Sequence, residues 1–248
     1  MRASSPQLIA AAAAALSLLA ATASAQTYVN LDIGPTGQRV ASDFLAVGST
    51  IAAGANDTNF PATTFTSFTG DQFTLAIDNI DRTGATVGAI DWRDRGDSTN
   101  GDNLTRVGED FVKNNAGVIR LTLGSIPLGS YSVRSFHIDP DNSQSDRIQV
   151  YVSDATQMFA LQPTQGNSGP LVGGVNNLNT ATVNASAANF SFTSNGTDPI
   201  VIVFDGRSSP NLDSEAPLNG LTITQVPEPT SVALIGLGTL ALVGRRRR

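Results

Sequence analysis

The feature that most constrains the fold of this chain is a series of short runs in which apolar and polar residues alternate. In one run, Tyr131, Val133 and Ser135 fall on one side. Arg134 and Phe136 fall on the other side of the same run. Alternation with a period of two is the repeat of a β-strand. Between the two ends of the chain no window shows the apolar stripe of an amphipathic helix, so the sequence predicts an all-β domain.

Residues that favour turns separate these runs, as they do in β-rich domains. A run at 147–152 follows the run at 130–138 across a polar turn, and we expect the two to pair as antiparallel strands. The strands expected in the whole domain are 27–33, 63–68, 72–80, 85–92, 118–123, 130–138, 147–153, 180–184, 189–193, 199–204 and 218–224.

Residues 1–25 have the organisation of a secretory signal peptide. Arg2 supplies a positive charge, and an apolar run rich in Ala and Leu follows it. The small residues Ala23 and Ala25 then precede Gln26. This order of a positive, an apolar and a small-residue region is typical of a peptide that is removed during export. We therefore predict cleavage between Ala25 and Gln26.

Residues 227–248 combine three features in order. They are a rigid polar segment, an apolar segment and a basic cluster: Pro227, Glu228 and Pro229; residues 230–244; and Arg245, Arg246, Arg247 and Arg248. Because an apolar segment enters the bilayer while arginines stay on the cytoplasmic side, we predict a single C-terminal transmembrane helix at 230–244, with the preceding domain outside. The most apolar part, 232–244, is shorter than the roughly 20 residues of a comfortable span, which suits a temporary anchor.

The tail from Val226 to Arg248 resembles the PEP-CTERM sorting signal, which consists of a Val-Pro-Glu-Pro motif, an apolar helix and an arginine cluster. The resemblance implies that an exosortase-type membrane protease recognises Pro227, Glu228 and Pro229 in a Gram-negative-type bacterium. It also implies that the mature protein is released or transferred to the cell surface, often into exopolysaccharide. The same signature is also known as an ice-binding protein C-terminal domain.

The mature domain, residues 26–226, is acidic and contains no cysteine. Five of the 15 basic residues and one of the 21 acidic residues lie in the two processed ends, so the domain has a net charge near −10. This charge argues against nucleic acid as a partner, because the phosphate backbone demands a basic surface. The lack of Cys and the single histidine, His137, exclude cysteine nucleophiles and multi-histidine zinc sites.

The end of the domain, Pro-Leu-Asn-Gly-Leu-Thr-Ile at 217–223, follows an apolar run at 198–204. This ending resembles the closing strands of galactose-binding-like jelly rolls, including malectin-like and carbohydrate-binding modules. The Pro/Gly turn and Tyr-x-Val strand at 121–133 resemble the same group. The resemblance implies a two-sheet jelly-roll β-sandwich in which the termini are close together and loops carry the function.

The densest polar cluster of the sequence offers a candidate ligand loop of Trp92, Asp94, Asp97 and Asp102. In one interpretation the loop is exposed, Trp92 stacks on a sugar ring, and the aspartates bind hydroxyl groups or calcium. In the other interpretation it is a solvated turn whose Asp side chains bond the local backbone, while Trp92 belongs to the core. The sequence leaves both interpretations open.

A second polar turn offers a candidate metal site of Asp139, Asp141 and Asp146, with oxygens spaced as in calcium loops. Gln144 and Val150 stand where an EF-hand needs glycine and a bidentate glutamate, so an EF-hand is excluded. A β-sandwich calcium site and a plain turn rich in Asp and Asn both stay open. No cofactor other than calcium is expected.

No catalytic constellation emerges from the sequence. It lacks a Gly-x-Ser-x-Gly elbow, and a lone strand histidine such as His137 is typical of a structural residue. We therefore expect a non-enzymatic protein of the cell envelope, cell surface or extracellular matrix, with a structural or glycan-contacting role. Its expected partners are the exosortase-type protease, the membrane and extracellular polysaccharide. The alternative is a secreted jelly-roll hydrolase or lyase in which a pair of aspartates acts on a glycan.

Overall fold

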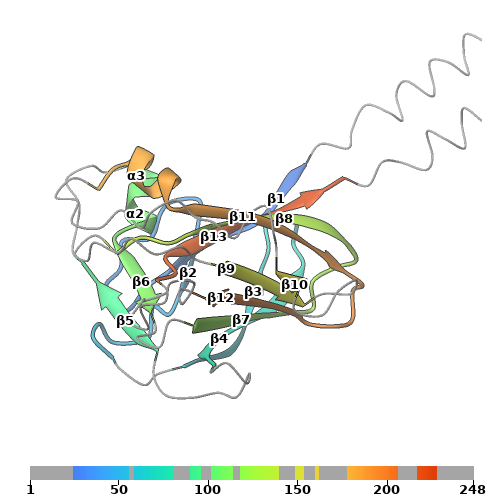
Figure 1. Cartoon of the computed structure of the whole chain (residues 1–248), viewed down its shortest axis with the longest axis horizontal. Coiled ribbons are helices and arrows are strands. Elements are labelled where there is room, and N and C mark those ends of the chain that lie inside the picture. The colour runs from blue at the N-terminus through green and yellow to red at the C-terminus, as the bar shows by residue number, and fades with distance from the viewer. Residues whose placement is uncertain are drawn as a thin grey trace, which may run out of the picture. The chain divides into compact units, whose positions relative to one another are not determined.

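Two β-sheets make up most of the chain that the structure describes (Figure 1). The structure is a computed structural model, and it describes residues 25–55, 59–80, 90–95, 102–113, 118–139, 149–153, 160–161, 178–205 and 217–227. The elements in these ranges are β1 (Gln26–Ile33), β2 (Leu45–Val47), β3 (Phe60–Thr66), β4 (Gln72–Asn79), β5 (Asp91–Asp94), α2 (Asn103–Val107), β6 (Asp110–Lys113), β7 (Val118–Gly124), β8 (Gly129–Phe136), β9 (Gln149–Ser153), β10 (Ala160–Leu161), α3 (Thr180–Ala185), β11 (Ala187–Ser194), β12 (Ile200–Asp205) and β13 (Gly220–Val226). Residues 27–225 form one compact unit.

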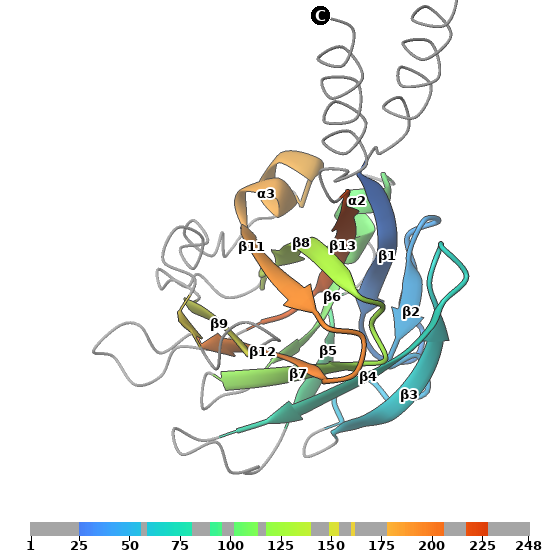
Figure 2. The ribbon, with the colours of Figure 1, turned by 90° about the vertical axis from the view of Figure 1, so that its right-hand side faces the viewer.

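The sheets face each other as the two layers of a sandwich (Figure 2). Over the described residues, one sheet has five strands in the order β11-β8-β13-β1-β2, and the other has six in the order β10-β9-β12-β7-β4-β3. β5 and β6 form a separate two-stranded ribbon, which a bridge between Val112 and Leu218 joins to the segment before β13. The prediction of a β-rich sandwich is confirmed.

Alternating burial along the strands builds the core between the sheets. On β4, Phe73, Leu75 and Ile77 are fully buried, whereas the residues between them are partly exposed. Tyr28 on β1 packs against Phe73 from the other sheet, with ring centroids 5.8 Å apart, and against Tyr131 on β8 at 5.6 Å. Burying a large apolar side chain stabilises a fold by about 1.5–3 kcal/mol. This inward set of side chains therefore holds the two sheets together.

Asn219, which precedes β13, is fully buried and connects four segments of the chain. Its backbone N–H donates to the carbonyl of Phe136, and its carbonyl accepts from the N–H of Ile33 at 2.7 Å. Its side-chain oxygen accepts from the N–H of Ile138 at 2.7 Å, while its side-chain nitrogen donates to the carbonyl of Asp110 at 2.9 Å. One residue thus satisfies backbone groups beside β1, β6 and β8 that would otherwise be buried without partners.

Gly220, the first residue of β13, lets the strand approach β1 closely. A Cβ atom at this position would lie 2.4 Å from the carbonyl oxygen of Leu31 and 2.8 Å from Cγ1 of Val107. Both contacts are far shorter than van der Waals distances, and one of the two atoms belongs to the backbone. The Asn-Gly pair of the sequence is therefore explained by packing and hydrogen bonding at the start of β13.

The two ends of the described domain lie side by side. The hydrogen bond from Ile33 to Asn219 places the end of β1 beside the start of β13, so these neighbouring strands run antiparallel. The start of β1 and the end of β13 consequently meet at the opposite end of the sandwich (Figure 1).

Two local expectations are wrong. The segment at 180–184 is helical in α3, where Asn179 forms a capping box with Thr182. The cap supplies partners for free backbone N–H groups, and this outweighs the strand preference of the β-branched residues. The run at 147–152 does not pair with 130–138 either, because β9 lies between β10 and β12 in the other sheet, while β8 pairs with β11.

Within the described ranges, no helix is long and apolar enough to span a bilayer. The predicted transmembrane helix at 230–244 lies outside the described residues, as does the apolar run of the predicted signal peptide.

Replacing Asn219 by alanine should destabilise the domain by about 3 kcal/mol. The change leaves the N–H of Ile138 and the carbonyl of Asp110 buried without their partners, and each such group costs about 1–3 kcal/mol. Urea unfolding of residues 26–226 measures the loss. Asn189→Ala, the same change at an exposed position of β11, is the control and should stay within about 0.5 kcal/mol of the parent. Equal effects of the two substitutions would contradict the role given to Asn219.

Candidate functional site

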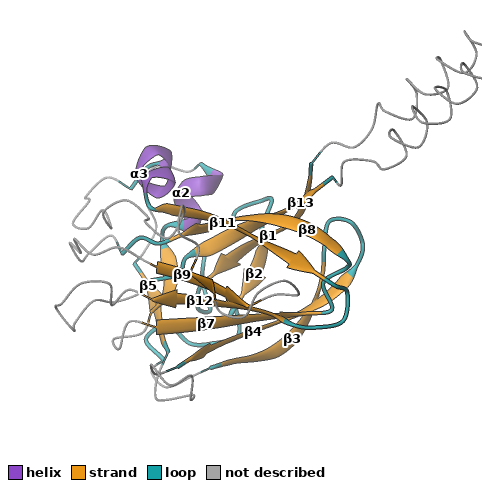
Figure 3. Cartoon of the chain, turned by 45° about the vertical axis from the view of Figure 1, so that its right-hand side comes forward, coloured by secondary structure: helices purple, strands orange, loops and turns teal. Residues whose placement is uncertain are grey.

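Buried polar and charged side chains gather where β1 and β8 end and β13 begins. We call this region the polar end of the sandwich; it contains the buried Asp32, Glu109, Asp110, His137 and Asp139, with the exposed Asp94 opposite Asp110. The helices α2 and α3 lie at this end (Figure 3). Charges are rarely buried without partners, so such a concentration is where function or strain is expected.

Two carboxyl groups of the β5–β6 ribbon face each other at the polar end. Asp94 and Asp110 are directly opposite in the register of the two strands, Asp94 exposed and Asp110 buried. Burial raises the pKa of Asp110 to about 8, and the charges of Asp94, Asp32 and Glu109 act in the same direction. Two like charges at this spacing are unfavourable, so at neutral pH Asp110 keeps its proton and shares a hydrogen bond with Asp94.

Asp32, at the end of β1, is the second buried carboxyl with an altered proton affinity. One of its oxygens accepts a hydrogen bond from the N–H of Ala41 at 3.0 Å, and its other oxygen has no partner among the described residues. Burial raises the pKa of Asp32 to about 7, the bond from Ala41 opposes this rise, and the charge of Glu109 adds to it. Asp32 thus titrates near neutral pH.

Gly34 lets the backbone that follows β1 approach Asp110 closely. A Cβ on Gly34 would lie 2.4 Å from Cβ of Asp110 and 2.4 Å from the side-chain oxygen of Gln38, so only glycine fits between them. Neither amide atom of Gln38 has a hydrogen-bond partner among the described residues, and the same holds for Oδ1 of Asp110. Nothing in the local sequence signals this cluster, because its members come from segments far apart in the chain.

The arrangement of Asp94 and Asp110 suits proton sharing better than glycoside cleavage. A glycosidase needs two carboxyl groups roughly 5–9.5 Å apart, so that the sugar, or the sugar and a water, fits between them. Asp110 is buried, so a sugar placed at this pair would reach only the exposed Asp94. Among the described residues no group of three or more His, Asp or Glu side chains is arranged to hold a metal ion.

His137 forms a buried pair with Ser135 on the segment of β8. The ring Nε2 lies 2.7 Å from Oγ of Ser135, and Nδ1 lies 2.7 Å from the carbonyl oxygen of Pro217. Because a carbonyl only accepts, Nδ1 carries the proton and Nε2 accepts from the serine hydroxyl. Burial lowers the pKa of His137 to about 4, so the ring is neutral. Both side chains are fully buried, which makes the pair structural and withdraws it from any substrate.

Trp92 does not stack on a ligand, and that interpretation of the sequence is wrong. Its side chain is fully buried in the core, against Phe60 at a ring distance of 6.2 Å. Its ring lies so close to Gly48 that a Cβ there would come within 2.0 Å of it. The backbone of Trp92 is also paired with Ala55 and Gly54. A tryptophan at an inward position of a strand stabilises the fold more when its large apolar ring is buried in the core than when it is exposed.

The other predicted site residues have separate places. Asp102 caps α2 by accepting from the N–H of Thr105, and it also accepts from the hydroxyl of Thr180, the first residue of α3. These bonds, that of Thr180 first, lower the pKa of Asp102. Asp139 is buried and forms an ion pair with Arg95 at 3.2 Å. Asp97, Asp141 and Asp146 lie outside the described residues, as do Ala23, Glu228, Pro229 and the arginines at 245–248.

The stability of the domain should fall as the pH rises from about 6.5 to 9. Between these values the folded chain binds more protons than the unfolded chain, because the folded pKa values of Asp32 and Asp110 lie above the usual range. His137 is neutral in the folded chain over this range because its folded pKa is low, and its partial protonation in the unfolded chain near pH 6.5 offsets only about 0.4 kcal/mol of the loss. Asp110→Asn should remove about 1–2 kcal/mol of the loss, as measured by urea unfolding at both pH values.

Asp43→Asn is the matched control for this change, because Asp43 is exposed and remains hydrated. It should leave the pH dependence as in the parent. A parent whose stability is constant over this range would show that the two buried carboxyls are ionised in the folded chain.

Comparison with known proteins identifies the tail. Residues 225–248 match the PEP-CTERM protein-sorting motif. The match begins inside β13, whose last residue is Val226, so the motif continues directly from the folded strand. No curated protein matches the sequence.

Several solved structures resemble the domain at low identity. The plant receptor-like kinase ANX1 has a TM-score of 0.39 and 10% identity, over 82% of this chain and 49% of that chain. A family 35 carbohydrate-binding module from Clostridium thermocellum has a TM-score of 0.29 and 9% identity, over 68% of this chain and 95% of that module. The chain spans less than half the length of the plant receptor structures FER with RALF23 and LLG2 (41%) and ANX1 (49%). Through its last 24 residues, 225–248, the chain carries a PEP-CTERM protein-sorting motif, as its sequence predicts.

Proposed function

We propose that this chain is an exported, non-catalytic protein of the bacterial cell envelope, sorted by its C-terminal tail and processed by an exosortase-type membrane protease. The observation that carries the proposal is the PEP-CTERM motif at 225–248, which begins where the last strand of the domain ends. In this proposal Pro227, Glu228 and Pro229 are the recognition site for the protease. Arg245 to Arg248 hold the end of the tail on the cytoplasmic side.

The proposal gives each part of the chain a role in export. Residues 1–25 direct the chain across the membrane and are removed before Gln26. Residues 26–226 fold outside as a β-sandwich of jelly-roll type, and the tail anchors it until processing. The mature domain then stays at the surface or in the exopolysaccharide of a Gram-negative-type cell. Its acidic surface keeps the domain soluble by self-repulsion.

Two features of the polar end support a non-catalytic role. The single histidine is sealed in the core with Ser135, so it reaches no substrate. Asp110 is buried, so a substrate at this pair would reach only the exposed Asp94. In this proposal the domain contacts extracellular glycan without chemical turnover.

A second candidate function is a glycan-active hydrolase or lyase. The observation in its favour is that Asp94 is exposed beside a carboxyl that holds its proton at neutral pH, and an acid and a base in one place can serve catalysis.

Removing residues 227–248 should abolish envelope association, because the apolar segment and its arginine stop are lost. The deleted protein should appear in the medium, whereas the full chain should be recovered from the envelope. Intact mass spectrometry of the full chain should show a species that starts at Gln26 and ends near residues 227–230. Replacing Pro227, Glu228 and Pro229 together by alanine should leave a membrane-bound species that ends at Arg248.

Pro61→Ala, at an exposed position of β3, is the control for these changes and should be processed like the parent. An unchanged location of the truncated protein would refute sorting by the tail. A parent that still ends at Arg248 would refute processing.

Incubating residues 26–226 with the exopolysaccharide of its own host should give binding without release of sugar products. Co-sedimentation measures the binding, and chromatography of the supernatant measures the products. The second candidate function predicts the opposite result: products released by the parent and lost with Asp94→Ala. The exposed turn variant Asp43→Ala is the control for both measurements.

A further inference from the structure

Three large hydrophobic side chains are exposed among the residues that the structure describes. They are Phe68, Leu128 and Val226, with 46%, 69% and 41% of their surface accessible. They belong to three separate segments: the turn between β3 and β4, the turn between β7 and β8, and the end of β13. Single exposed hydrophobics are ordinary on a protein surface, but a shared location requires an explanation.

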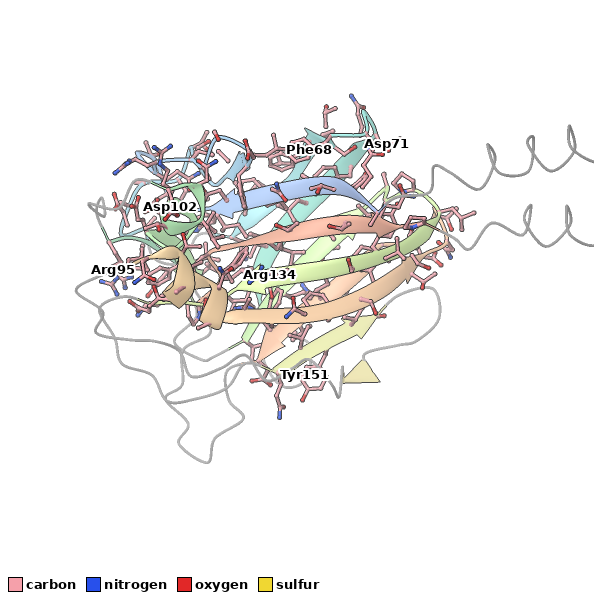
Figure 4. All side chains as sticks on the ribbon, turned by 90° about the horizontal axis from the view of Figure 1, so that it is seen from above. Phe68, Asp71, Arg95, Asp102, Arg134 and Tyr151 are labelled. Carbon is pink, nitrogen blue, oxygen red and sulfur yellow. The ribbon has the colours of Figure 1, made fainter. Side chains whose placement is uncertain are left out.

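All three lie at the end of the sandwich where β1 starts and β13 stops. The N–H of Phe68 donates to the carbonyl of Tyr28, near the start of β1. Leu128 precedes Gly129, and a Cβ on that glycine would lie 3.1 Å from the side-chain nitrogen of Gln225 on β13. Figure 4 shows Arg95 and Asp102 toward one end of the sandwich and Asp71, in the turn of Phe68, toward the other. We call Phe68, Leu128 and Val226 the apolar end.

The charges near the apolar end are acidic. Asp71 follows Phe68 in its turn, and Asp198 lies in the turn from β11 to β12 that adjoins Leu128 through Gly196. The turn segments 67–71, 124–129 and 195–199 contain no Lys or Arg. Electrostatic attraction to anionic lipid therefore cannot bring this end to a membrane, whereas apolar contact can.

The segment between β13 and the apolar part of the tail is short, and this limits how far the apolar end can lie from the membrane. Six residues lead from Val226 to Val232, where the most apolar part of the tail begins, and they span at most about 20 Å when extended. β13 cannot swing away from the sheet, because it is held between β8 and β1. The polar interface of a bilayer is itself about 5–7 Å thick on each side. If the tail enters the membrane, the end of β13 therefore lies at most about 20 Å from the start of the apolar segment, and the apolar end is close to the lipid head groups.

We propose that the apolar end rests on the outer surface of the bilayer that the tail enters, with Phe68 and Leu128 in the head-group region. This proposal depends on the proposed function, because it requires the tail to insert. It explains why the exposed hydrophobics lie beside the exit of the chain. It also gives the domain an orientation in which the polar end faces away from the membrane.

The chain contains no cysteine, so single cysteines can carry an environment-sensitive fluorophore at chosen positions. The full chain is placed in vesicles of phosphatidylcholine and phosphatidylethanolamine, and each label is tested for a blue shift and for quenching by nitroxide lipids. Labels at Phe68→Cys and Leu128→Cys should shift to the blue and be quenched. A label at Ser42→Cys, exposed and bonded to Asn103 of α2 at the polar end, is the control and should report water.

A fourth label separates the two proposals. Ser231→Cys reports whether the tail itself has entered the lipid. If that label is buried in lipid while those at Phe68 and Leu128 report water, the present proposal is overturned and the proposed function stands. If the label at Ser231 also reports water, both proposals are overturned.

Two further results would redirect the proposal. Burial of the labels at Phe68 and Leu128 only when exosortase is present would overturn contact with lipid and identify the protease as the occupant. Quenching that requires anionic phosphatidylglycerol would overturn the apolar mechanism. The emission of the buried Trp92 verifies in each variant that the domain is folded.

Discussion

The hydrogen bonds of Asn219 hold together segments that are 81 or more residues away from it in the chain. Its side chain reaches the carbonyl of Asp110 and the N–H of Ile138, and its backbone reaches β1. Each of these groups is buried, and each would carry a desolvation cost without this partner. The same bonds fix where β13 enters the sheet. The close approach of Gly220 to β1 then places the last strand between β1 and β8.

The position of β13 gives the domain two different ends. At one end the chain turns back into the sheet, and carboxyl groups are packed so tightly that Asp110 keeps its proton. At the other end the first and last strands stop side by side, and the exposed hydrophobics gather there. The sorting motif continues from β13 without a linker, because the match begins at residue 225. The strand β13 therefore connects the hydrophobic core directly to the sorting motif.

Local patterns predicted the fold well where a strand satisfied its own period. The alternation around Tyr131 and Val133 appears as alternating burial on β8. Prediction failed where a local helix cap or a distant strand partner decided the outcome. The β-branched residues at 180–184 form a helix because Asn179 caps it, and β9 leaves the sheet of β8 for that of β12. The carboxyls Asp32 and Asp110 gave no signal, because each is ordinary in its own segment and unusual only beside the other.

The sequence by itself determined the sorting motif at 225–248, the all-β class and the acidic charge of the domain. Hydropathy, the order of charges and the strand period are properties of consecutive residues, so they can be interpreted without knowledge of the tertiary structure. The tertiary structure alone decided that Trp92 is buried, that Asp94 and Asp110 face each other, and that Phe68, Leu128 and Val226 lie toward one end. Those facts depend on which strands become neighbours. Strand pairing joins residues through backbone groups that are the same in every residue, so it leaves little trace in the order of the side chains.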